Sequence, residues 1–162
     1  MEKINIVQIV NQEGCFDLQF RKDTKANRTN SPTYYRWKVQ FIITKNASQS
    51  NVLESVRDTL QCGNVHVVKN QARYSVQNIT EVYECVVPYF KKHALSGKKK
   101  NDFQAWSKAV EIIYKNKGKI LAAWIPGDFQ KLMAIHKDIA KYKSRPKKAK
   151  YLSMAETFAQ SV

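Results

Sequence analysis

The first apolar segment of the chain, IVQIVNQEGCF at Ile6–Phe16, changes its hydrophobic period at a glycine. Before Gly14 the apolar residues are spaced as in a short helix that ends at Glu13, and after it they alternate with polar residues. Alternation is typical of a strand that buries one of its two faces. The pattern therefore predicts a helix over Ile6–Glu13 that runs directly into a strand.

A second alternating segment, YYRWKVQFIITK, follows the polar stretch DTKANRTNSPT. Asn30, Ser31 and Pro32 in that stretch favour a turn. We therefore predict a hairpin in which a long polar tip joins two strands. The hairpin buries a face made of Phe16, Leu18, Phe20, Tyr35, Trp37, Val39, Phe41 and Ile43.

The next part of the chain repeats the order of helix and hairpin. A helix is predicted from about Asn51 to a stop at Gly63, and the strands NVHVVK and RYSVQ form a second hairpin joined at Asn70-Gln71. A third helix begins near Asn78 and is expected to end before Pro88, because proline disfavours helix in the residue before it. Two further helices are predicted over NDFQAWSKAVEIIYK and GDFQKLMAIHKDIAKYK.

This order of elements predicts an α+β fold of the αββαββα type. Four antiparallel strands form one sheet, helices cover one of its faces, and the other face remains free and basic. We expect one domain over residues 1–143 and a basic C-terminal tail over residues 144–162.

The free face of the predicted sheet carries side chains of the kinds that read base edges. The major groove of B-DNA admits a two-stranded β-ribbon, and contacts to phosphates add affinity to the contacts that bases make. A solvated sheet face is polar in many α+β domains as well, so the pattern alone leaves both interpretations open. The candidate nucleic-acid-binding residues of the strands and the hairpin tip are Asp17, Gln19, Arg21, Arg28, Arg36, Lys38, Gln40, Arg73, Ser75 and Gln77.

The charge balance favours nucleic acid as the partner. The chain has 28 Lys and Arg residues against 13 Asp and Glu residues, a formal net charge of +15. Such an excess suits a phosphate backbone, and solubility alone does not require it. No apolar run approaches the ~18 residues of a membrane span, so no membrane partner is expected. Three widely spaced cysteines form no CxxC pair, so neither a zinc site nor a disulfide framework is predicted.

The chain contains, in this order, the segments IVQIVNQEGCF, QCGNV, VVPYFKKHALSGKKKNDFQAW and GDFQKLMAIHKDIAKYK. Together these four segments resemble the LAGLIDADG homing endonucleases. IVQIVNQEGCF is similar to the signature helix with the acidic residue and glycine that end it, and QCGNV is similar to the turn into the third strand. VVPYFKKHALSGKKKNDFQAW resembles the segment in which a lysine precedes DF, and GDFQKLMAIHKDIAKYK resembles the late helix. The resemblance covers most of residues 4–146 and implies a site-specific enzyme that cuts both strands of DNA.

The resemblance also implies where such an enzyme has its catalytic centre. Two signature helices pack at a two-fold axis, so a chain with one repeat would form a homodimer through Ile6–Glu13. Mg²⁺ would bind Glu13 and the carbonyl oxygen of Gln12, and it would stabilise the attacking and leaving oxygens of phosphodiester hydrolysis. Lys99 matches the family's lysine near the scissile phosphate. The implied catalytic residues are Glu13, Lys45 and Lys99, and the flanking nucleic-acid contacts are Lys98 and Lys100.

Three residues of the signature helix depart from the family pattern. Gln8 and Gln12 stand where the family usually carries small residues, and Asn11 stands where it usually carries an acidic one. Because Gln8 and Gln12 are four residues apart, they share a helix face and would push a partner helix outward. The departures favour an alternative function, a catalytically inactive descendant that binds RNA.

The sequence therefore leaves several functions open. The first is a Mg²⁺-dependent DNA endonuclease, and the second is a structural or maturase-like RNA-binding protein of an organellar ribonucleoprotein such as a mitochondrial ribosome. The third is a basic α+β domain outside this family that binds an acidic protein or a membrane surface. On family grounds a mitochondrion or another organelle is the expected setting, with a phage or a bacterial cytoplasm as the alternative.

Overall fold

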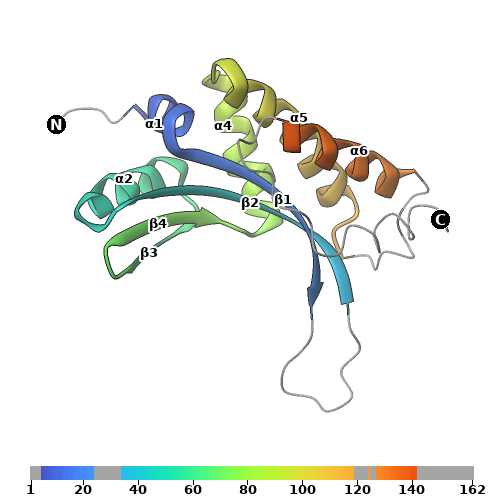
Figure 1. The fold of residues 1–162 in the computed structure, drawn as a ribbon, viewed down its shortest axis with the longest axis horizontal. Coiled ribbons are helices and arrows are strands. Elements are labelled where there is room, and N and C mark those ends of the chain that lie inside the picture. The colour runs from blue at the N-terminus through green and yellow to red at the C-terminus, as the bar shows by residue number, and fades with distance from the viewer. Residues whose placement is uncertain (1–4, 24–33, 119–123, 125–126, 142–162) are drawn as a thin grey trace, which may run out of the picture.

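The computed structural model describes residues 5–23, 34–118, 124 and 127–141, and it confirms the predicted α+β fold (Figure 1). The predicted domain boundary at residue 143, the tail and the tip residue Arg28 lie outside the described residues. The elements are, in chain order, α1 (Ile6–Glu13), β1 (Gly14–Asp23), β2 (Tyr34–Asn46), the 3-10 helix η1 (Ala47–Gln49), α2 (Ser50–Leu60), β3 (Asn64–Val68), β4 (Gln71–Val76), α3 (Ile79–Glu81), the π-helix η2 (Val82–Val86), α4 (Val87–Lys92), α5 (Gly97–Lys115) and α6 (Asp128–Lys141).

The four strands form one antiparallel sheet in the order β1-β2-β4-β3. β1 pairs with β2 along its whole length, from Gly14 opposite Ile43 to Asp23 opposite Tyr34. β4 pairs with the second half of β2, and β3 forms the edge of the sheet. In Figure 1 the labelled helices all lie on one side of the curved sheet, and no described helix covers the other side.

Alternation along β1 and β2 builds the core between the sheet and the helices. Phe16 and Phe41 are fully buried, and their ring centroids lie 5.2 Å apart. The ring of Phe16 also packs on Trp106 of α5 at 4.9 Å, and Nε1 of Trp106 donates to the carbonyl oxygen of Asp17 at 2.9 Å. Each buried aromatic side chain contributes roughly 1.5–3 kcal/mol, so this cluster holds α5 firmly against the sheet.

The prediction that the third helix ends before Pro88 is wrong. The chain stays helical from Ile79 to Lys92 through α3, η2 and α4, and Pro88 lies in the first turn of α4. In η2 the N–H of Val87 bonds to the carbonyl of Val82, five residues back, which widens the helix. Proline is tolerated where a new helical segment begins, because the N–H that it lacks is not needed there.

Two other boundaries differ from the prediction by a few residues. The turn between β3 and β4 consists of Lys69 and Asn70 rather than Asn70-Gln71, and Lys69 has φ 54°. α5 begins at Gly97 rather than Asn101, so its first turn contains Lys98, Lys99 and Lys100. Among the described residues, no helix combines the length and apolar character needed to cross a membrane.

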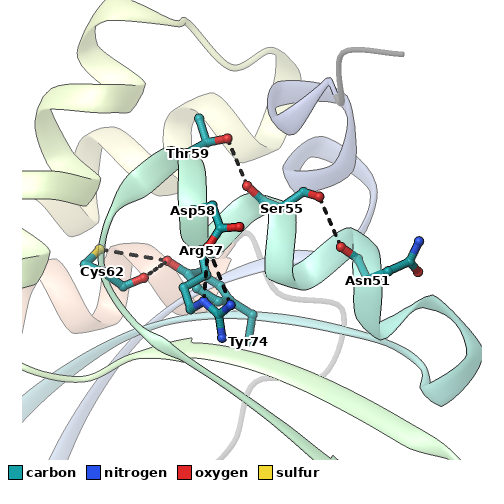
Figure 2. Close-up of polar contacts among 7 residues, drawn as sticks. All are labelled: Asn51, Ser55, Arg57, Asp58, Thr59, Cys62 and Tyr74. Atoms are coloured by element: carbon teal, nitrogen blue, oxygen red, sulfur yellow. Dashed lines mark hydrogen bonds and ion pairs between the residues drawn. The ribbon is translucent and has the colours of Figure 1, made fainter. Parts of the chain in front are cut away.

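A buried hydrogen bond ties the end of α2 to β4 (Figure 2). The hydroxyl of Tyr74 donates to the carbonyl oxygen of Cys62 at 2.8 Å, and both residues are buried. Burial raises the pKa of the Cys62 thiol to about 12 and also raises the pKa of the Tyr74 hydroxyl, so both groups keep their protons at neutral pH. Gly63 between them has φ 87°, and a Cβ there would lie 2.8 Å from the Tyr74 ring, so this turn requires glycine.

Asp128 begins α6 and joins it to the end of α5. Its carboxylate lies 3.3 Å from Nζ of Lys115 and accepts a hydrogen bond from Nδ2 of Asn116 at 3.1 Å, while only 3% of the side chain is exposed. Burial acts to raise the pKa of this carboxyl, but the hydrogen bonds and the positive charges of Lys115 and Lys131 together hold it below the ordinary value. The ionised carboxylate therefore stabilises the junction of α5 and α6.

Tyr74→Phe should lower the free energy of unfolding by about 1–3 kcal/mol, because the buried carbonyl of Cys62 loses its donor. Urea denaturation followed by circular dichroism measures the change. Tyr83→Phe is the control, since half-buried Tyr83 packs through its ring on Tyr114, with centroids 4.0 Å apart. A Tyr74→Phe variant as stable as the wild type would contradict the role assigned to this hydrogen bond.

Asp128→Asn should make the free energy of unfolding change less with pH in the acidic range. Because the folded pKa of Asp128 is lowered, its contribution is present above the unfolded value of about 3.9 and is lost as the pH falls through the folded value. We expect the variant to be about 1 kcal/mol less stable than the wild type at pH 7, with the difference shrinking below about pH 4. Urea midpoints across this range measure it.

Asp58→Asn serves as the matched control for this substitution. The side chain of Asp58 is 72% exposed, and it faces Arg57 at 3.4 Å on the surface of α2. The urea midpoint of Asp58→Asn should equal that of the wild type at every pH. A difference between Asp128→Asn and the wild type that stays constant from pH 7 to pH 3 would show that the charge of Asp128 does not stabilise the junction.

Candidate nucleic-acid interface and catalytic centre

The three predicted catalytic residues meet where α1 runs into β1. Glu13 is the last residue of α1, and its carboxylate lies 3.0 Å from Nζ of Lys45, near the end of β2. Lys99, in the first turn of α5, donates from Nζ to the carbonyl oxygen of Gly14. The fold thus gathers Glu13, Lys45 and Lys99, here called the junction cluster, from three distant parts of the sequence.

Gly14 allows the helix to pass into the strand without a loop. Its backbone is already extended, with φ −73° and ψ 149°, while its N–H still bonds to the carbonyl of Val10. A Cβ at this position would lie 2.6 Å from Cγ1 and 2.8 Å from the carbonyl oxygen of Val10. Any side chain here would push β1 away from α1 and change the spacing within the junction cluster.

The junction cluster is open to solvent on one side. The side chain of Glu13 is 40% exposed, whereas that of Lys45 is 12% exposed. Lys98 and Lys100 are exposed on the first turn of α5. Their charges add to the positive end of the helix dipole, so this corner of the molecule favours an anion such as a phosphate.

The donor set at the junction suits a shared magnesium site. The described residues contain no group of three or more His, Cys, Asp or Glu side chains that could hold a metal ion. Mg²⁺ prefers oxygen ligands and is commonly held by one or two carboxylates together with substrate phosphates. The carboxylate of Glu13 and the carbonyl oxygen of the neighbouring exposed residue Gln12 are oxygens of this kind.

The outward face of α1 is polar. Ile6 and Val10 are buried in the core, whereas Gln8 and Gln12 are exposed. Asn11 has a structural role that the sequence pattern did not reveal. Its Oδ1 accepts a hydrogen bond from the backbone N–H of Ser96 at 3.2 Å, which ties α1 to the start of α5.

The uncovered side of the sheet, here called the polar face, carries a set of mutually bonded side chains. Gln19 donates from Nε2 to the carboxylate of Asp17, and Lys38 donates from Nζ to Oε1 of Gln77 at 3.0 Å. Arg73 is exposed on the same face. These five residues were all predicted to bind nucleic acid, and the structure places them on one surface.

Other predicted contacts are placed differently. Gln40 and Ser75 are only 6% exposed, so little of either side chain is available for contact with a ligand. Arg21 and Arg36 lie opposite each other in the pairing of β1 and β2. The pairing of β3 and β4 adds three exposed residues to the polar face that sequence reasoning missed, although the alternation through Arg73 could have found them: Asn64, Val68 and Gln71.

A curated protein shares part of this sequence. A protein of Mycosarcoma maydis described as probable intron-encoded DNA endonuclease 1 is 31% identical over 97 residues. The aligned region is 59% of this chain and 32% of that protein, so the chain spans about a third of the length of this curated relative.

Several solved structures share the fold. The homing endonuclease I-TnaI aligns with a TM-score of 0.65 and 17% identity, over 96% of this chain and 94% of that chain. I-SmaMI, bound to an uncleaved DNA target in the presence of calcium ions, aligns with a TM-score of 0.70 and 18% identity over 96% of this chain and 49% of that chain. I-AabMI, bound to uncleaved DNA, aligns with a TM-score of 0.63 and 23% identity over 96% of this chain and 49% of that chain.

The likeness to these structures supports the fold, and the family assignment comes from the sequence. The family model described as LAGLIDADG endonuclease matches residues 10–110, which is more than half of the 162 residues. The matched region contains the junction cluster and the whole of the described sheet. This chain belongs to the LAGLIDADG endonuclease family.

Proposed function

We propose that this chain is one half of a site-specific DNA endonuclease, which binds duplex DNA on the polar face and cleaves it at Glu13 when two α1 helices are paired. The observation that carries the proposal is the junction cluster. It combines a solvent-accessible carboxylate, Glu13, with Lys45 of β2, which forms an ion pair with it, and Lys99 of α5, which bonds to the carbonyl oxygen of the next residue, Gly14. Phosphodiester hydrolysis needs this combination of negative and positive groups beside one phosphate.

Each residue of the cluster has a distinct task in this proposal. Glu13 and the carbonyl oxygen of Gln12 hold Mg²⁺, which when bound supplies electrostatic stabilisation for the oxygens around phosphorus. Lys99 lies at the Gly14 carbonyl, beside the carboxylate, and is positioned to orient water and to stabilise charge on the phosphate. Lys45 balances the charge of Glu13 and holds its side chain in place.

The polar face supplies binding in the same proposal. The net charge of +15 gives an affinity for the phosphate backbone that weakens steeply with salt. Asp17, Gln19, Lys38, Arg73 and Gln77 supply donors and acceptors of the kinds that bond to base edges. I-SmaMI and I-AabMI are named as bound to DNA, and both share the fold of this chain, which supports DNA as the ligand.

A second function is favoured by one observation, the exposure of Gln8 and Gln12 on the outward face of α1. Close packing of two helices needs small residues at the contact, and two glutamines hold the backbones apart. The two Glu13 carboxylates would then be too distant for a shared metal site. In that case the chain is an inactive descendant that binds RNA through its basic surface, as part of an organellar ribonucleoprotein such as a mitochondrial ribosome.

Glu13→Gln should abolish cleavage while leaving DNA binding within about threefold of the wild type. Metal-bound chemistry contributes several kcal/mol, so the cleavage rate should fall by at least about a hundredfold. Sequencing the cut ends of a randomised duplex library, incubated with Mg²⁺ or Mn²⁺, measures cleavage. Glu54→Gln, an equivalent change at an exposed position of α2, should cut normally. Wild-type protein that binds nucleic acid and cuts nothing would favour the second function.

Replacing Gln8 and Gln12 together with alanine should strengthen pairing between two chains. The shorter side chains let the helices approach, so the dissociation constant of the dimer on DNA should fall by about tenfold or more, for a gain of about 1.4 kcal/mol. Sedimentation velocity measures it, with Gln104→Ala on the exposed face of α5 as the control. Unchanged association would show that α1 does not form the contact between chains.

A further inference from the structure

The hairpin of β3 and β4 carries an exposed apolar side chain on the polar face. Among the described residues, the exposed large apolar side chains are Val67, at 53%, and Val68, at 67%. Val68 lies opposite the exposed Gln71, whereas Val67 lies opposite the buried Ala72. Residues directly opposite each other share one side of a sheet, so Val68 lies on the polar face and Val67 on the other side. Single exposed apolar residues are common on proteins, so the role of Val68 depends on its neighbours.

Val68 and Gln71 are neighbours at the closed end of the hairpin. The Cβ atoms of directly opposite residues are ~5 Å apart, so the two side chains can contact one ligand together. The turn beside them is tied to the rest of the sheet, since the carbonyl oxygen of Asn70 accepts a hydrogen bond from the N–H of Ala47 at 2.9 Å. Asn46, opposite Gln71 on β2, uses its Oδ1 to cap η1. The hairpin therefore presents Val68 and Gln71 as a fixed pair.

An A·T base pair presents groups that fit this pair of side chains. In the major groove adenine offers the N7 acceptor and the N6–H₂ donor, and thymine offers O4 and the C5-methyl group. The amide of Gln71 has both an acceptor and donors, so it can bond to N6 and N7 of adenine at once. Val68 is an apolar partner for the methyl group of the thymine.

We propose that Gln71 and Val68 read one A·T base pair in the major groove, with Gln71 on the adenine and Val68 on the thymine methyl group. This assignment rests on the proposed function, in which the polar face binds duplex DNA. A G·C pair fits poorly, because guanine has the acceptor O6 where adenine has its amino group, and cytosine has no methyl group. The reversed pair, T·A, would place the methyl group against the amide of Gln71.

The charges around the pair support a role in specificity rather than in affinity. Lys69, in the turn, and Arg73, two residues after Gln71 on the same face of β4, are both exposed cations. Cations supply affinity for phosphates, whereas a valine and a neutral amide add none, and base contacts carry the sequence information. Changes at Val68 and Gln71 should therefore alter base preference more than overall affinity.

Gln71→Glu tests the adenine contact, because a carboxylate accepts from N6 but has no donor for N7. Binding sites are selected from a randomised duplex library with the wild type and with the variant. At one A·T position the variant should lose on the order of tenfold in its preference for adenine, and it should accept cytosine, whose N4–H₂ donates to a carboxylate. Gln104→Glu makes the same charge change on the exposed face of α5 and should keep the wild-type preference.

Uracil tests the thymine contact, because it differs from thymine only in lacking the C5-methyl group. Uracil in that same base pair should weaken wild-type binding by about fourfold, the loss expected for one buried methyl group. Val68→Ser has no apolar side chain for the methyl group and should bind both duplexes equally. Val67→Ser is the matched control on the other side of the hairpin, and it should respond to uracil as the wild type does.

The outcomes distinguish this assignment from the proposed function. If Gln71→Glu and uracil act on different base pairs, or if uracil at every thymine of the site leaves wild-type binding unchanged, the assignment is wrong while DNA binding stands. If the wild type enriches no duplex at all, the proposed function fails, and this assignment fails with it. Thermal melting verifies that the variants fold, and the uracil measurement on the wild type needs no variant.

Discussion

The arrangement of the junction cluster depends on the close contact between Gly14 and Val10. Because Gly14 has no side chain, β1 starts at the residue where α1 ends, and the helix needs no loop to enter the sheet. That direct passage puts the carboxylate of Glu13 beside a strand pair, where Lys45 reaches it at 3.0 Å. It also exposes the Gly14 carbonyl to Lys99. A loop of even two residues would separate these groups.

The period of two along β1 and β2 separates their side chains into a set that is buried in the core and a set on the uncovered side of the sheet. One set of side chains, centred on Phe16 and Phe41, packs against Trp106 and closes the core. The alternate set forms the polar face, and none of the described helices covers it. Since a shift of one residue in the pairing would exchange the two sets, the aromatic core also fixes which polar groups face outward.

The sequence alone was sufficient to predict the helices and strands that follow from the local spacing of apolar residues. It predicted the helix that ends at Glu13, the four strands and the buried stripe of α5, because each repeats an apolar residue at the spacing of its own element. It also predicted, through the family resemblance, that Glu13, Lys45 and Lys99 belong together. The catalytic and nucleic-acid-binding roles of the candidate residues remain proposals.

The sequence failed where long-range contacts or unusual backbone geometry decide the outcome. A π-helical turn, η2, precedes Pro88, and the local sequence pattern did not predict that turn. Gln40 and Ser75 alternate with the core residues as the pattern requires, but each is only 6% exposed, and alternation alone does not predict that burial. The bond between Asn11 and Ser96 joins residues 85 positions apart, so only the folded chain reveals it.

That bond has a consequence for how α1 can move relative to α5. Asn11 anchors α1 to Ser96, and Lys99 anchors the start of α5 to Gly14, so two tethers join the same pair of elements within a few residues. A partner that displaced α1 would therefore also strain both contacts with the start of α5, which carries Lys99.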